Sequence, residues 1–154
     1  QLLRGGWTDG PEEEAALVER HIAPTPRVAA GQLLQSMASA CIDISDGLVQ
    51  DAGHLALASR CGARIDLASL PLSPAYDRLT AELPDRWAPA LGGGEDYELL
   101  FAMPAPMITT ASLTARGAGV VLHEIGELVE GDGVAVVDGQ GQTLSPPPGF
   151  QHRW

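Results

Sequence analysis

The chain has 154 residues, with 20 acidic residues against nine basic ones, and its formal net charge is −11 at pH 7. All nine basic residues are arginines, which excludes the GxxxxGK[ST] phosphate-binding loop because that loop needs its lysine, and no basic stripe is present for nucleic acid or an anionic membrane surface. No apolar run approaches the roughly 18 residues of a membrane-spanning helix, so we expect one compact, cytoplasmic domain over residues 1–154.

The N-terminal part of the chain predicts two helices separated by a proline-rich break. Pro11 suits the first turn of a helix, and the three glutamates after it complement the helix dipole, so we expect a helix from Pro11 to about His21. Residues 23–26 (APTP) end this helix. Apolar side chains on one face predict a second helix over residues 28–37.

The central part of the chain alternates strands and helices. An apolar and β-branched run predicts a strand over residues 40–44, and residues 45–47 form a turn that opens a helix ended by Gly62. Residues 63–67 predict the next strand. A further helix is expected after Ser73, which is its N-cap.

The C-terminal part continues the alternation. A helix is expected over residues 106–116, ended by Gly117 or Gly119. Further strands are expected at residues 98–103, 120–125 and 134–137. A hairpin-type turn at residues 138–139 leads toward residues 142–144. The whole pattern predicts an α/β (α+β) fold in which helices cover a mixed β-sheet.

Asp43, Ser45 and Asp46 lie where the first strand ends and a helix begins, so two carboxylates and a hydroxyl can converge beside free backbone N–H groups. Two interpretations stay open from the local sequence. Ser45 or Asp46 could cap the helix, with Asp43 only ending the strand. Alternatively, the pattern Asp-x-Ser-Asp supplies the hard oxygen ligands that Mg²⁺ takes together with phosphate oxygens and water.

Residues 92–98 (GGGEDYE) form a second candidate site. Three glycines allow a ligand to approach the backbone closely, and two acids follow at once. The same segment can equally be a flexible turn with solvated carboxylates. At the C-terminus, the aromatic residues Phe150 and Trp154 beside His152 either stack on a heteroaromatic ring or pin the tail onto the core.

Two other pairs of reactive side chains are assigned structural roles. Asp51 and His54, three residues apart on one helix face, are expected to form a solvated pair. Cys41 and Cys61 lack a CxxC pattern and partners at metal-ligand spacing, so reduced thiols are expected. Cys41 is expected to be a buried and inert strand thiol.

Three motifs occur in a fixed order, followed by a characteristic ending: residues 23–28 (APTPRV), 42–48 (IDISDGL), 93–99 (GGEDYEL) and 149–152 (GFQH). Together they resemble the thiamine-monophosphate kinase family over almost the whole chain. The second motif is shared in looser form with a wider superfamily of aminoimidazole-ribonucleotide synthetase, selenophosphate synthetase and a hydrogenase maturation factor. The resemblance implies the C-terminal domain of that superfamily, and transfer of the ATP γ-phosphate to thiamine monophosphate to give thiamine diphosphate.

The resemblance also implies roles for individual residues. Asp43 and Asp46 match family positions that bind Mg²⁺, and Ser45 matches a position that contacts ATP. Glu95 matches the acid that binds the thiamine phosphate substrate, with Asp96 as the nearby alternative.

The end of the chain and the rest of the family's architecture complete these implications. Phe150 matches an aromatic residue that contacts substrate, whereas Arg153 interrupts the family's usual ending and leaves the role of Trp154 open. The family has an N-terminal domain, absent from this sequence, with further Mg²⁺ and ATP ligands and the main contact of a homodimer, so this chain alone is expected to be inactive. The alternatives are another ATP-dependent member of the superfamily, either selenophosphate synthetase-like or hydrogenase maturation factor-like, and a non-catalytic ligand-binding module.

Overall fold

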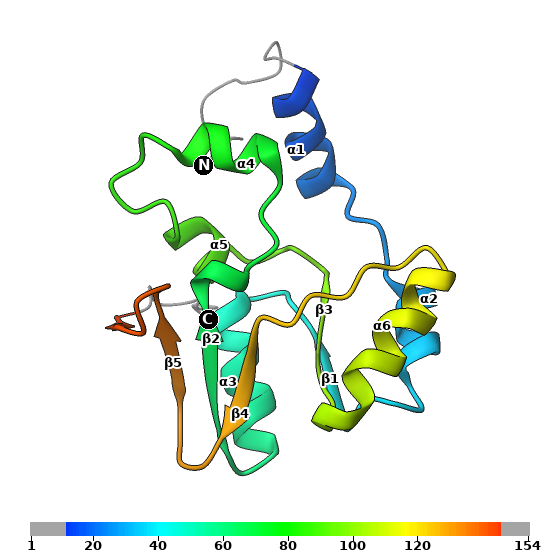
Figure 1. Ribbon diagram of the computed structural model, residues 1–154. Helices are drawn as coiled ribbons and strands as arrows, with labels where there is room; N and C mark the ends of the chain where they lie inside the picture. Colours follow the sequence, from blue (N-terminus) through cyan, green and yellow to red (C-terminus); the bar gives the residue numbers. More distant parts are fainter. Residues whose placement is uncertain (1–11, 146–154) are drawn as a thin grey trace, which may run out of the picture.

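The computed structural model describes residues 12–145, which form two β-sheets with helices packed around them (Figure 1). The α-helices are α1 (Glu12–Ile22), α2 (Val28–Leu34), α3 (Leu48–Ala58), α4 (Pro74–Thr80), α5 (Ala88–Gly92) and α6 (Ile108–Gly117). The strands are β1 (Ala40–Asp43), β2 (Gly62–Asp66), β3 (Leu99–Ala102), β4 (Gly126–Val129), β5 (Val134–Val137) and β6 (Thr143–Leu144). The predicted α/β class is confirmed, although the strands divide into two sheets.

The two sheets differ in size and in strand direction. The smaller sheet is an antiparallel pair in which Asp43, the last residue of β1, lies opposite Leu99, the first residue of β3. The larger sheet has the strand order β4-β2-β5-β6. Strand β2 runs antiparallel to β4 and parallel to β5, so this sheet is mixed, as the sequence predicted.

Helix α3 connects the two sheets and supplies much of the hydrophobic core. Its residues Leu48, Ala52 and Leu55 are buried, and the helix contacts β1, β2 and β5. Ile65 of β2 and Val136 of β5 are buried in the same core. Figure 1 shows α3 behind the larger sheet, while α2 and α6 lie beside β1 and β3. Each fully buried aliphatic side chain stabilises the fold by about 1.5–3 kcal/mol. This packing therefore holds the start of α3 in a fixed position relative to the end of β1.

Most predicted elements are confirmed to within a few residues. Ser73 is the N-cap of α4, and its hydroxyl accepts the backbone N–H of Tyr76 at 3.1 Å. The hairpin-type turn before β6 is also confirmed, since the N–H of Asp138 donates to the carbonyl of Gln142 at 3.0 Å. Helix α2 stops at Leu34 rather than at residue 37, and the short helix α5 was not predicted.

The predicted strand over residues 120–125 is wrong. Residues 120–125 belong to no strand. The carbonyl of Ile125 accepts the N–H of Asp66 at 2.9 Å, and the strand itself begins at Gly126. The reason is the length of the neighbouring strand β2. It spans only Gly62–Asp66, so it does not extend far enough to pair with residues 120–125. Val121 is 70% exposed, so it lacks the packing against a sheet that underlies the β propensity of valine.

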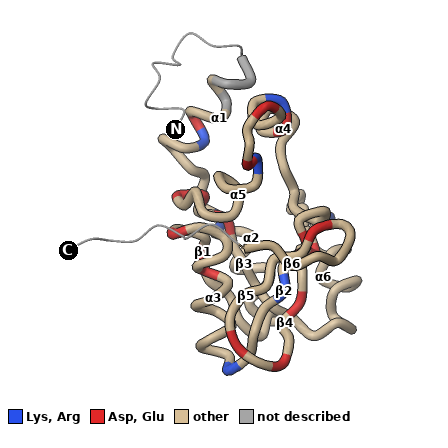
Figure 2. Tube along the Cα trace, turned by 90° about the vertical axis from the view of Figure 1, so that its left-hand side faces the viewer, with Lys and Arg blue, Asp and Glu red and all other residues tan. Residues whose placement is uncertain are grey.

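The charged residues are spread over the described part of the chain. In Figure 2 the arginines are scattered along the described trace rather than aligned in a stripe, and acidic positions lie on many elements. None of the helices within residues 12–145 has the length and apolar character needed to cross a membrane.

Candidate functional site

The two motif loops meet at one edge of the smaller sheet. Residues 44–47 follow the end of β1, and residues 93–98 precede the start of β3. Since β1 and β3 are antiparallel, the end of one strand lies beside the beginning of the other. The two candidate segments, far apart in sequence, are therefore direct neighbours.

Backbone hydrogen bonds join these two loops. The N–H of Glu95 donates to the carbonyl of Ser45 at 2.8 Å, and the N–H of Tyr97 donates to the carbonyl of Ile44 at 2.8 Å. The N–H of Ile44 in turn donates to the carbonyl of Glu98 at 2.9 Å. This ladder continues the β1–β3 pairing past the ends of both strands and fixes the backbone of each motif against the other.

The glycines of the motifs are needed for this close approach. Gly94 has φ +66°, and a Cβ atom at this position would lie 2.8 Å from the carbonyl oxygen of Ser45. Gly47 has φ +110°, and a Cβ atom there would lie 2.9 Å from the Cα atom of Gly92. Only a residue without a side chain fits either position without moving the neighbouring loop.

Two residues of the second loop also have strained backbones. Glu95 has φ 61° and Tyr97 has φ 49°, values in the left-handed region that cost non-glycine residues about 1 kcal/mol or more. Their backbone N–H groups are the two that bond the first loop, so the hydrogen bonds hold the strained conformation in place. Strain of this kind is concentrated at functional sites in proteins.

The predicted metal and nucleotide residues at the end of β1 and in the first loop lie at the surface of this edge. Asp43 is exposed, and Ser45 and Asp46 are half-buried. Gln50 of α3 donates to the Asp46 carboxylate at 3.2 Å. The N-cap position of α3 is Gly47, so the capping interpretation placed the start of the helix one or two residues too early.

Asp51 is the residue that the sequence interpretation misjudged. It is only 2% exposed, so the interpretation as a solvated pair is wrong for this carboxylate, although His54 is exposed. Its Oδ2 atom accepts the backbone N–H of Ser45 and that of Asp46, each at 2.9 Å. One sequence signal was available, because Asp51 falls on the same helical face as the buried Leu48 and Leu55, where an acid is unexpected.

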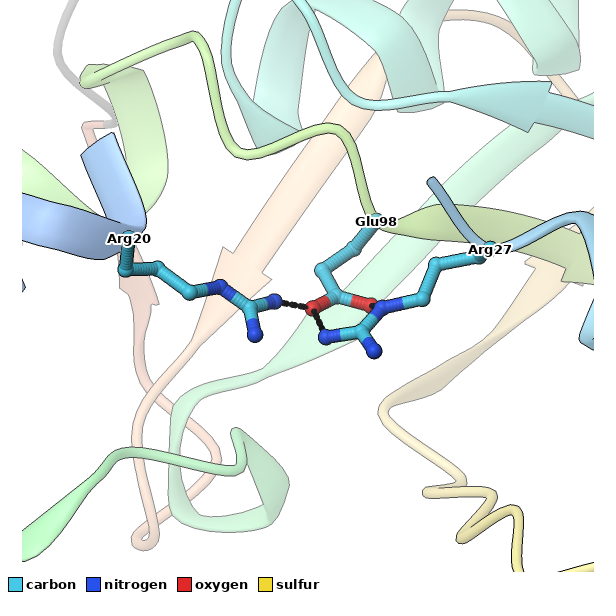
Figure 3. Close-up of polar contacts among 3 residues, drawn as sticks. All are labelled: Arg20, Arg27 and Glu98. Carbon is cyan, nitrogen blue, oxygen red and sulfur yellow. Dashed lines mark hydrogen bonds and ion pairs between the residues drawn. The ribbon is translucent and has the colours of Figure 1, made fainter. Parts of the chain in front are cut away.

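Two arginines and a histidine approach the acidic loop from α1 and from the segment before α2. Figure 3 shows Arg20 and Arg27 converging on Glu98 from opposite sides. Arg27 binds both carboxylate oxygens, with Nε 2.9 Å from Oε2 and a terminal nitrogen 2.7 Å from Oε1, and Arg20 also donates to Oε1. His21 lies 3.4 Å from the Glu95 carboxylate. These contacts attach α1 to the loop that carries the predicted substrate residue.

The electrostatic environment differs among these groups. Loss of solvation, followed by the nearby charge of Arg20, lowers the pKa of Arg27. Desolvation raises the pKa of Asp96, while the positive charges of Arg20 and His21 oppose that rise. The Glu95 side chain keeps 61% of its surface exposed and is therefore accessible to a ligand.

The cysteines play no part in this arrangement. Cys41 and Cys61 are both free thiols, as predicted. Cys41 is exposed, however, so the expectation of a buried strand thiol is wrong. Partial desolvation and the negative charge of Asp43 raise the pKa of the Cys41 thiol, which disfavours the nucleophilic thiolate.

A divalent cation at this edge would rest on few protein ligands. Within residues 12–145 no group of three or more His, Cys, Asp or Glu side chains is arranged to hold a metal ion. Asp43 and Asp46 nevertheless suit Mg²⁺, which is typically bound by one or two carboxylates together with phosphate oxygens and water. Phe150, the other predicted substrate contact, lies outside the described residues, as do His152 and Trp154.

The fold and the paired loops are those of a known class of α/β domain. Residues 2–139 match the family model described as "AIR synthase related protein, C-terminal domain", so the chain belongs to this family. Within it, the chain is 44% identical over 131 residues to a thiamine-monophosphate kinase of Escherichia coli strain K12, a match covering 83% of this chain and 40% of the relative.

Solved structures give the same result. The structure described as "AaThiL complexed with AMPPCP and TMP" matches with a TM-score of 0.81 and 35% identity, covering 99% of this chain and 46% of that one. The thiamine-monophosphate kinase of Stenotrophomonas maltophilia K279a matches with a TM-score of 0.77 and 37% identity, covering 86% of this chain and 40% of that one. The resemblance seen in the motifs is confirmed, and the chain spans less than half the length of these relatives.

Proposed function

We propose that this chain is the C-terminal, substrate- and metal-binding half of a kinase that transfers the γ-phosphate of ATP to thiamine monophosphate. The observation that carries the proposal is the hydrogen-bonded union of the two motif loops, residues 44–47 and 93–98, at one sheet edge. Similarity to relatives of this activity over most of the chain supports the same reading.

Asp43 and Asp46 are the proposed Mg²⁺ ligands of this half. A carboxylate and a phosphate oxygen about 5 Å apart repel by about 3 kcal/mol at an effective dielectric constant near 20. Without a cation, the carboxylates of this edge would therefore exclude ATP. Bound Mg²⁺ supplies positive charge that neutralises phosphate oxygens and aligns them for transfer.

The remaining residues of the two loops have distinct proposed roles. Ser45, between the two metal ligands in sequence, contacts ATP through its hydroxyl. Glu95 binds the substrate, whose thiazolium ring carries a positive charge that an exposed carboxylate complements. Asp96, the next residue along the chain, is the alternative contact. Phe150 is proposed to stack on the substrate rings.

The proposed reaction needs no strong general base from this chain. The acceptor is the phosphate group of thiamine monophosphate, which is already ionised at neutral pH and can attack directly. The task of the protein is then to bind and orient two anionic substrates in line.

The proposal also includes partners outside this chain. Because the relatives are more than twice as long as the matched region, we propose that a further N-terminal domain completes the ATP site and forms a homodimer. The complete protein is proposed to act in the cytoplasm. The chain by itself is proposed to be inactive, because half of the cleft is missing.

An activity assay with the complete protein tests this function. The parent should convert thiamine monophosphate and ATP to thiamine diphosphate and ADP, and Asp46→Asn should abolish turnover at fixed ATP while circular dichroism stays unchanged. Unchanged turnover in Asp46→Asn would refute the assignment. Parallel assays with the substrates of the other superfamily members separate the alternative reactions. ADP formation by the isolated chain would disprove the predicted dependence on a second domain.

A further inference from the structure

We propose that Asp51 is a positioning residue that fixes the backbone between the two proposed Mg²⁺ ligands, so that Asp43 at the end of β1 and Asp46 in the first loop are held in place to bind Mg²⁺. The inference rests on the proposed function. It assigns a role to a buried carboxylate that contacts neither substrate in the proposal. Its basis is the unusual place of this group, which is buried in the core beneath the exposed edge of the site.

The geometry of Asp51 follows from its place in α3. It is the fourth residue of the helix, and its N–H donates to the carbonyl of Gly47 at 3.0 Å, closing the first helical turn. Helical side chains point back toward the N-terminus, so the carboxylate reaches over this turn to the residues before it. There, one oxygen accepts the N–H groups of both Ser45 and Asp46 at 2.9 Å.

These bonds hold the Ser45 residue from both sides. Its N–H donates to the carboxylate of Asp51, and its carbonyl accepts the N–H of Glu95 in the second loop at 2.8 Å. The neighbouring Ile44 is bonded through both its N–H and its carbonyl to the second loop. The backbone from residue 44 to residue 46 is therefore held by at least one hydrogen bond at every residue.

A carboxylate suits this task better than a neutral acceptor. Two N–H donors share a single oxygen, and bonds to an ionised acceptor are shorter and about twice as strong as neutral ones. The other oxygen lies 3.7 Å from Nδ1 of His54, whose side chain is half exposed. The carboxylate is also at the N-terminal turn of α3, where the helix dipole favours negative charge.

Asp138 provides a matched control for a purely structural role. Its Oδ1 atom likewise accepts two backbone N–H groups, from Gln140 at 2.9 Å and from Gln142 at 2.8 Å, in the turn between β5 and β6. Removing either carboxylate deletes the same number and kind of hydrogen bonds. A specific effect on metal binding should appear only at Asp51.

The experiment compares Asp51→Ala, Asp51→Asn, Asp138→Ala and Asp46→Asn in the complete protein. Mg²⁺ binding is titrated by calorimetry with a non-hydrolysable ATP analogue present, and amide hydrogen exchange is followed at Ser45 and Asp46. We expect Asp51→Ala to weaken Mg²⁺ binding by about tenfold or more, the scale seen when groups that orient metal ligands are removed. Asp51→Asn, which keeps one acceptor oxygen, should weaken it by about threefold.

The outcomes separate this inference from the proposed function. Faster exchange at the two amides with weaker Mg²⁺ binding in the Asp51 variants, and normal binding in Asp138→Ala, supports the inference. A folded Asp51→Ala protein whose Mg²⁺ affinity stays normal, or an equal loss in Asp138→Ala, overturns it. If Asp51→Ala does not fold, unchanged affinity and exchange in Asp51→Asn overturn it instead. Normal Mg²⁺ binding in Asp46→Asn would show that the proposed metal site itself is wrong.

Discussion

Replacing Gly94 by alanine tests whether the contact between the two motif loops is as close as the structure has it. Alanine must adopt φ +66° at this position, which costs an L-residue about 1 kcal/mol. Its Cβ atom would also lie 2.8 Å from the carbonyl oxygen of Ser45, closer than real contacts allow. The second loop must therefore move away from the first.

The movement should break the bond from the N–H of Glu95 to the carbonyl of Ser45, now 2.8 Å long. A hydrogen bond of this kind contributes about 1 kcal/mol. Adding the backbone strain, we expect Gly94→Ala to lower the free energy of unfolding by about 2–3 kcal/mol. For a protein of this size that corresponds to a fall in melting temperature of about 5–10 °C.

Gly119→Ala is the control for backbone strain without the clash. Gly119 has φ +75°, and nothing lies within 4 Å of the position its Cβ atom would take. This variant should lose only about 1 kcal/mol. Thermal and urea unfolding of both variants, followed by circular dichroism, measure the difference. Equal destabilisation of the two proteins would refute the close approach of the loops, and with it the geometry on which the proposed site depends.

Other predictions concern the charged groups around the second loop. Arg27→Lys should lower the free energy of unfolding nearly as much as Arg27→Ala, because an ammonium group cannot make the bidentate contact with Glu98. Equal stability of Arg27→Lys and the parent would contradict this. Arg20→Ala should cost less than about 1 kcal/mol, since its pair is exposed, and added salt should shrink the difference. Because desolvation raises the pKa of Asp96, the folded protein holds this proton more tightly than the unfolded chain, so stability falls as pH rises from the ordinary aspartate range through the raised pKa. Asp96→Asn should remove that decline of stability in unfolding titrations. A pH profile of stability that is the same in Asp96→Asn and in the parent would contradict this prediction.

The order and type of most elements follow from local sequence. Alternating apolar runs and turn residues were sufficient to predict β1, β2, β3 and β5, and capping chemistry was sufficient for Ser73 at the start of α4. The motifs of the two loops also marked the candidate site, because glycines, acids and a hydroxyl at strand ends are local features. The partner strand is not a local feature, which is why residues 120–125 were predicted as a strand that the short β2 cannot pair with.

Only the tertiary structure decided how the two motifs cooperate. The antiparallel pairing of β1 and β3 brings together loops about 50 residues apart in sequence, and this pairing depends on register rather than on any single residue. Asp51 illustrates the same limit, because its place on the helix face of Leu48 and Leu55 indicates burial but not which groups its carboxylate bonds. Its burial and its two bonds to Ser45 and Asp46 arise because core packing of α3 sets the helix directly under the first loop. Local sequence specifies which groups are present, whereas packing over long separations specifies which of them face one another.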